Sequence, residues 1–139
     1  MLSKLALAIG ILSLVTACAV PHANLDTNPA FTSHEFANHE LAISWKTESN
    51  DKGVRIDGTV KNVRPDLPYS SLQLTAKLLD ESGNTLGKGT KDFQGRFTGS
   101  EPFSMEIPVP QRESVKKVNF SYSYGTTEDF HRNDFDSVP

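Results

Sequence analysis

The feature that most constrains the fold of this chain is a period-two alternation of apolar and polar side chains, which recurs in five separate segments. The apolar members of these segments are Leu41, Ile43 and Trp45; Val54, Ile56 and Val60; Leu72, Leu74, Ala76 and Leu78; Phe103, Met105 and Ile107; and Val118, Phe120, Tyr122 and Tyr124. Successive side chains of a β-strand point to opposite faces, so this pattern predicts strands with one buried and one solvated face. No segment has a convincing helical period, and the chain is predicted to be all-β.

Turn-forming sequences at residues 50–53, 64–68, 80–84 and 108–110 separate the predicted strands. A weaker strand is predicted at 85–92, where glycines and lysines interrupt the alternation, as in a short or bulged edge strand. Antiparallel strands joined by short turns predict a single immunoglobulin/fibronectin III-like β-sandwich of six to seven strands. Because Cys18 is the only cysteine, no disulfide is predicted within this sandwich.

The central block from residue 54 to residue 124 resembles the FxLYD and LEA type 2 (water-stress) β-sandwich domains. The matching features are Gly58-Thr59-Val60-Lys61-Asn62, Tyr69 ahead of Leu72-Gln73-Leu74, Leu78-Leu79-Asp80 followed by residues 82–87, and residues 99–103. The resemblance implies an immunoglobulin-like fold, a secreted or envelope location and no assigned catalytic residues. The glycines and the asparagine of these motifs are interpreted as turn and bulge residues and not as a site.

The N-terminal segment has the order of a bacterial export signal. Lys4 gives it a positive start, residues 5–14 are mostly apolar, and residues 16–17 are small, as a cleavage site requires. The run from Val15 to Cys18 resembles the lipobox of bacterial lipoproteins. The resemblance implies that the Cys18 thiol carries a diacylglyceryl group and that cleavage makes Cys18 the first residue of the mature chain.

Two alternatives to a lipoprotein signal are an uncleaved membrane helix and an ordinary cleaved signal. A spanning helix needs about 20 apolar residues, whereas polar residues begin by His22. An ordinary signal leaves the cysteine at the cut without a role. Ala19 follows the cysteine, at the position where an aspartate retains enteric lipoproteins in the inner membrane. The expected location is therefore the bacterial cell envelope, with a lipid anchor in the outer membrane and the domain facing the periplasm.

The predicted organisation is a lipoprotein signal peptide (1–17), a lipidated tether (18–38), a β-sandwich domain (39–125) and a flexible acidic tail (126–139). Lys4 is the only charged residue of the signal, so 13 of the 14 basic residues and all 17 acidic residues belong to the mature chain. This acidic balance does not suit a general nucleic-acid binder, which has a clustered basic excess. The expected partners are the membrane, through the lipid on Cys18, and an envelope protein.

Two histidine–glutamate pairs, His34-Glu35 and His39-Glu40, have some likeness to a zinc protease signature. That signature needs two histidines four residues apart on one face of a helix, whereas these are five apart and precede a strand. They are interpreted as surface histidines, and no metal or cofactor is predicted.

Several aromatic residues occupy positions that should face inward. They form either a sugar-stacking platform or, in the favoured interpretation, part of the core. This set is Trp45, Phe120, Tyr122 and Tyr124.

Loop parity predicts one contact surface. Successive loops of an antiparallel domain alternate between its two ends, so the chain entry near His39, the loops at 63–70 and 93–101 and the tail should share one end, held towards the membrane by the tether. The candidate contact patch at this end consists of Arg64, Phe93, Arg96 and Phe97. Exposed phenylalanine and arginine together favour an interface. The alternative is that the two phenylalanines cap the core.

No catalytic motif is found: the sequence has no Gly-x-Ser-x-Gly elbow, and an acylated Cys18 is not a nucleophile. The expected function is that of a non-enzymatic, membrane-anchored envelope lipoprotein whose β-sandwich acts as a protein-interaction or structural module. The alternative is a binder or carrier of a small apolar ligand. A large apolar cavity between the sheets would favour the carrier, whereas a core filled by Trp45, Phe103 and Phe120 would argue against it.

Overall fold

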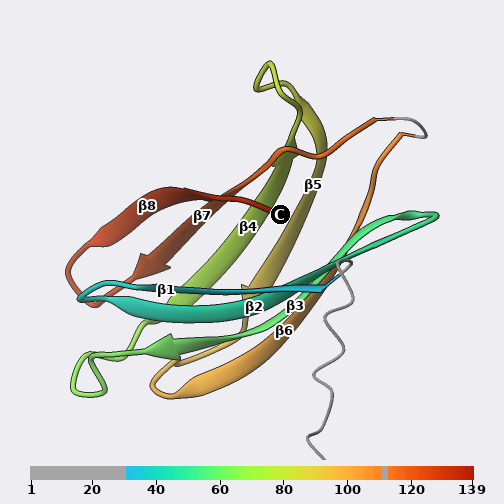
Figure 1. Ribbon diagram of the computed structural model, residues 1–139. Helices are drawn as coiled ribbons and strands as arrows, with labels where there is room; N and C mark the ends of the chain where they lie inside the picture. Colours follow the sequence, from blue (N-terminus) through green and yellow to red (C-terminus); the bar gives the residue numbers. More distant parts are fainter. Residues whose placement is uncertain (1–30, 111–112) are drawn as a thin grey trace, which may run out of the picture.

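The computed structural model describes residues 31–110 and 113–139, which form a two-layered all-β structure (Figure 1). Its strands are β1 (Phe31–Ala37), β2 (Leu41–Asn50), β3 (Gly53–Asn62), β4 (Ser71–Leu79), β5 (Thr85–Phe93), β6 (Ser100–Pro108), β7 (Lys117–Gly125) and β8 (Phe130–Ser137). They make two four-stranded antiparallel sheets with the orders β1-β2-β3-β6 and β5-β4-β7-β8. The prediction of an all-β sandwich is confirmed at this level. The signal segment, Cys18 and Ala19 lie outside the described residues.

The described residues contain no candidate for a membrane-spanning helix.

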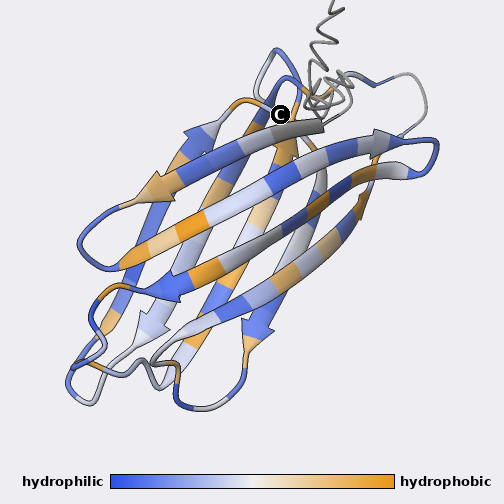
Figure 2. Ribbon diagram, turned by 60° about the horizontal axis from the view of Figure 1, so that its bottom comes forward, coloured by the Kyte–Doolittle hydropathy of each residue, from blue (hydrophilic) through white to orange (hydrophobic). Residues whose placement is uncertain are grey.

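The alternating sequence pattern decides which face of each strand is buried. Every apolar residue of the five predicted segments lies in the core between the sheets, and the alternation of hydrophobic and hydrophilic residues is visible along the strands (Figure 2). Trp45, for example, is 4% exposed, and its ring centroid lies 4.7 Å from that of Phe120 on the opposite sheet. The predicted strand register is therefore confirmed for β2.

Glycines allow the two sheets to close at the side where β5 and β6 meet. A Cβ at Gly87 would lie 2.6 Å from the carbonyl oxygen of Pro108, and a Cβ at Gly89 would lie 2.9 Å from Cγ1 of Ile107. These glycines therefore interrupt the alternation of β5 because β6 packs directly on them. As predicted, β5 is an edge strand, and its pairing with β4 shifts register between Leu78 and Leu79.

The opposite side of the sandwich is closed by two strands that the sequence analysis did not predict. β1 lies within the predicted tether, and β8 lies within the predicted flexible tail, so the described part has eight strands instead of six to seven. Each is an edge strand with a single neighbour, and the rings of Phe36 and Phe135 stack across the gap between them at 3.7 Å. The folded unit therefore begins before residue 39 and continues past residue 125.

The connections between strands gather at two ends of the sandwich. One, which we call the tyrosine end, comprises residues 38–40, 63–70, 94–99 and 126–129. An isolated bridge between Tyr69 and Phe97 and a hydrogen bond from Ser70 N to Gly125 O hold these segments together. The predicted grouping of these loops is confirmed.

The other end, which we call the hairpin end, comprises the turns at 50–53 and 80–84, the first residue of β1 and the last residue of β8. Phe31 pairs with Glu48 at this end, and Ser137 pairs with Val118. The predicted entry of the chain near His39 is therefore wrong, because β1 first carries the chain from the hairpin end along the length of the sandwich.

Candidate functional site

The tyrosine end contains a buried carboxylate. Glu40, in the short connection between β1 and β2, is only 6% exposed. The connection is fixed by Asn38, whose Oδ1 accepts hydrogen bonds from the backbone N–H groups of Glu40 and Leu41, both at 2.8 Å. Asparagine side chains commonly stabilise turns in this way. The turn directs the Glu40 side chain towards the opposite sheet.

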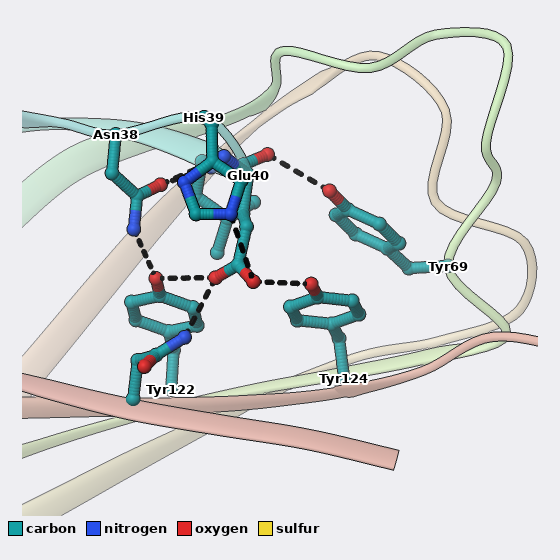
Figure 3. A network of polar contacts seen from close by, with 8 residues as sticks. Asn38, His39, Glu40, Tyr69, Tyr122 and Tyr124 are labelled. Carbon is teal, nitrogen blue, oxygen red and sulfur yellow. Dashed lines mark hydrogen bonds and ion pairs between the residues drawn. The ribbon is translucent and has the colours of Figure 1, made fainter. Parts of the chain in front are cut away.

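Donors from β7 and β8 surround the Glu40 carboxylate (Figure 3). The hydroxyl of Tyr124 donates to Oε1 at 2.7 Å, and the hydroxyl of Tyr122 donates to Oε2 at 2.8 Å. Asn133 Nδ2 also donates to Oε2, at 2.7 Å. We call these four residues the glutamate–tyrosine cluster. Because Glu40 belongs to one sheet and its donors to the other, the cluster joins the two layers.

The surroundings of the cluster set its charge state. Burial by itself raises the pKa of Glu40, but the hydrogen bonds from Tyr124 and Tyr122, the nearby His39 and the bond from Asn133 outweigh it, so the pKa lies below the usual 4.5. Burial raises the pKa of Tyr122 to about 12, and Glu40 reinforces this shift. Burial and Glu40 also raise the pKa of Tyr124. Around neutral pH, the cluster is therefore one carboxylate bound by two neutral phenols.

A second set of hydrogen bonds holds the adjoining loops. Asn62, at the end of β3, donates from Nδ2 to the carbonyl oxygens of Leu67 at 3.0 Å and Phe97 at 3.2 Å. Its Oδ1 accepts from the backbone N–H of Arg64 at 2.7 Å. The hydroxyl of Tyr69 donates to the backbone oxygen of Glu40 at 2.9 Å. The contact of Asn62 with Arg64 agrees with the interpretation of this asparagine as a turn residue, and its bonds to Leu67 and Phe97 also hold the two adjoining loops.

The glutamate–tyrosine cluster is suited to holding structure and not to proton transfer. Both carboxylate oxygens already accept hydrogen bonds from protein donors, and the side chain is almost completely buried. A general base must reach a substrate proton directly or through one water. A fully satisfied buried network instead rigidifies the elements that it joins. We therefore interpret the cluster as a polar cross-link between the sheets.

The four residues of the predicted contact patch differ in burial. Phe93 and Phe97 are buried, with 3% and 1% exposure, and their rings meet edge to face at 5.5 Å. Arg64 and Arg96 are exposed on the neighbouring loops. The two rings offer no exposed apolar surface, so the exposure that the patch required is not met. They cap the core, as the alternative interpretation had it.

The remaining candidate residues also have structural positions. His39 is exposed, but His34 is half-buried and its ring stacks on that of Trp45 at 5.2 Å. The residues that were considered as a sugar-stacking platform are all buried in the core. In residues 31–110 and 113–139, no group of three or more histidine, cysteine, aspartate or glutamate residues is placed to hold a metal ion.

Fold and site together define a class of structure: a two-sheet β-sandwich whose layers are joined at one end by a buried carboxylate. A comparison of the chain with protein-family models and with curated proteins finds no match.

Replacing Glu40 by glutamine should lower the free energy of unfolding by about 1–3 kcal/mol near neutral pH, because hydrogen bonds to a charged acceptor are lost or weakened. The matched change at an exposed glutamate of β1, Glu35→Gln, should alter it by less than about 0.5 kcal/mol. Urea unfolding followed by intrinsic fluorescence measures both.

The wild type and the Glu40→Gln variant also test the charge of Glu40. Because the pKa of Glu40 is lowered in the folded state, its ionised form stabilises the fold fully above the usual value of 4.5. This contribution decreases as the pH falls through that value and is lost below the folded-state pKa. The difference between the wild type and Glu40→Gln should therefore shrink from neutral pH to about pH 3. A difference that does not change with pH would contradict the ionised cluster.

Proposed function

We propose that this chain is a non-enzymatic lipoprotein of the bacterial cell envelope, whose β-sandwich acts as a protein-interaction or structural module. The observation that carries the proposal is the run from Val15 to Cys18 behind an apolar stretch, which resembles a lipobox. Acylation of Cys18 then provides the anchor, and Ala19 favours the outer membrane with the domain in the periplasm. Both carboxylate oxygens of Glu40 accept hydrogen bonds from protein donors, which supports a role without catalysis.

We further propose that the sandwich is of the immunoglobulin/fibronectin III type, in line with the resemblance to FxLYD and LEA type 2 domains. The order β2-β3-β6 in one sheet and β5-β4-β7-β8 in the other supports this proposal. If β2 to β8 are the seven strands of a fibronectin III-like sandwich in chain order, this is the order expected in its two sheets. β1 is then an additional strand at the edge of the first sheet.

The filled core favours the interaction module over a carrier of small apolar ligands. Trp45 and Phe103 are 4% exposed, and Phe120 is completely buried. These rings occupy the space between the sheets that an apolar ligand would need. Three hollows of about 340–710 Å³ among the described residues lie on the outer faces and at the hairpin end, and polar side chains contribute to the lining of each.

The anchor is tested by Cys18→Ser, which should move the protein from the membrane fraction to the soluble fraction, because the lipid is its proposed membrane attachment. Thr16→Ser keeps a small residue before the cut and should leave the distribution unchanged. Intact-mass analysis of the wild type should find diacylglyceryl on a new N-terminus at Cys18. A wild-type protein that is soluble and begins at another residue would refute the lipoprotein proposal.

A further inference from the structure

The outer face of the sheet β5-β4-β7-β8 contains two adjoining hollows. Their volumes are about 260 Å³ and 340 Å³, and together they fall in the range of small-molecule sites, about 300–1,000 Å³. Both are lined by Gln73, Ser123 and Phe130. The sheet positions these side chains, because the residues that alternate with the buried positions of each strand all point to this outer face.

The smaller hollow, which we call the basic hollow, is lined by three cationic side chains: Lys77 on β4, Lys88 on β5 and Arg132 on β8. No carboxylate lines it; the adjoining hollow has one, Asp92, which accepts a hydrogen bond from Gln73 Nε2 at 2.7 Å. None of the three cations forms an ion pair among the described residues. The chain as a whole has a net charge of −3. Three unpaired cations around one hollow therefore stand out against an acidic protein and favour an anionic ligand.

Neutral hydrogen-bonding groups lie between these cations. Thr75 is 7% exposed, and its Oγ1 lies 3.1 Å from Oγ1 of Thr90 across the β4–β5 ladder. Ser121 pairs with Thr75 in the β4–β7 ladder and also lines the basic hollow. Hydroxyl groups both donate and accept hydrogen bonds, which suits a ligand that itself carries many hydroxyl groups.

An exposed aromatic ring stands at the rim. Phe130 is 69% exposed and is, with Val138, one of two strongly exposed large hydrophobic residues among the described residues, and it lines both hollows. It begins β8 opposite Gly125, next to the row that contains Arg132. An aromatic face beside hydroxyl groups and cations matches a pyranose ring, which has an apolar C–H face, polar edges and, in acidic sugars, an anionic substituent.

We propose that the basic hollow binds an acidic saccharide, a sugar that bears a carboxylate or phosphate group. Phe130 packs on the ring, the threonine and serine hydroxyls bind the sugar hydroxyls, and Arg132 with Lys77 and Lys88 binds the anionic group. A protein partner is less suited to this face, because protein interfaces depend on several large anchors, whereas Phe130 is the one strongly exposed aromatic ring that lines the two hollows. A nucleic acid is less suited because its row of phosphates would have to extend beyond the three cations onto Asp134 and Asp136 of the same face, whereas a single anionic group needs only the basic hollow.

The test uses the full chain purified in detergent and titration calorimetry. The probe is a tetrasaccharide of alternating glucuronate and N-acetylglucosamine, and its neutral control is the tetramer of N-acetylglucosamine. The acidic sugar should bind at least about tenfold more tightly than the neutral one, since a charge-assisted hydrogen bond is worth about that factor. This binding should weaken with added salt. Because the test needs no lipid anchor, its outcome is separate from that of the Cys18→Ser experiment.

Variants locate the binding on the face. Arg132→Gln and Phe130→Ala should each weaken binding of the acidic tetrasaccharide about tenfold while leaving the unfolding midpoint unchanged, because both side chains are exposed. The matched control is Lys117→Gln, which removes a cation of the same face that already pairs with Asp136 at 3.0 Å; its affinity should stay within about twofold.

Three results would overturn the proposal. The first is the absence of saturable binding of the acidic tetrasaccharide. The second is unchanged affinity in Arg132→Gln or Phe130→Ala. The third is tighter binding of a polyglutamate peptide than of the saccharide, lost in the same variants, which would assign the face to an acidic protein segment.

Discussion

Deleting residues 126–139 should abolish cooperative folding or remove most of the stability of the domain. β8 pairs with β7 along its whole length, from Phe130 opposite Gly125 to Ser137 opposite Val118. Phe135 covers the rings of Phe120 and Phe36. Domains of this size are stable by only about 5–15 kcal/mol, so losing a strand and uncovering a core ring consumes most of that margin. Circular dichroism and urea unfolding of the truncated chain measure the loss.

A pair of point variants on the same strand provides the control. Phe135→Ala should cost about 2–4 kcal/mol, towards the low end for a large-to-small change because the ring is only partly buried. Phe130→Ala should cost less than about 0.5 kcal/mol, since that ring is 69% exposed. If the truncated protein kept its stability to within about 1 kcal/mol, the region would be the flexible tail that its composition predicted.

Trp45→Ala should lower the free energy of unfolding by about 3–5 kcal/mol, because it removes the largest side chain of the core from between the sheets. The ring of Trp45 contacts Phe120 and Phe135 of the other layer. The neighbouring variant Lys46→Ala changes an exposed side chain on the opposite face of β2 and should cost less than about 0.5 kcal/mol. Since Trp45 is the only tryptophan, a water-like emission spectrum of the folded wild type would contradict its burial.

The sequence predicted β2, β3, β4, β6 and β7 from their apolar inner faces, because there the period-two pattern records burial directly. β5 was predicted only as a weaker edge strand. The sequence did not predict β8, whose inward positions include His131, Asn133 and Phe135. His131 stacks on Tyr124, and Asn133 donates to Glu40. The inner face of this edge strand is polar because it completes a polar cluster, so hydrophobic alternation is absent where the strand is nevertheless required.

Glu40 was also missed as a structural residue. It was considered only as half of a histidine–glutamate pair, since a single glutamate before a strand carries no pattern of its own. The available signal was the pair Tyr122 and Tyr124 at inward parity, because buried phenol groups usually find a hydrogen-bond partner. Which residue supplies that partner depends on how the sheets stack, and this is a long-range property that local periodicity does not encode.

The course of β1 has a mechanical consequence. The strand starts at the hairpin end and runs to the tyrosine end, with seven residue pairs along β2. A pull between the chain that precedes Phe31 and a body held at the tyrosine end acts along this strand. This pull loads all hydrogen bonds of the β1–β2 ladder together, in shear. A force perpendicular to the strand would instead break them one after another. The β1–β2 ladder therefore makes the domain resistant to a force that is directed along β1.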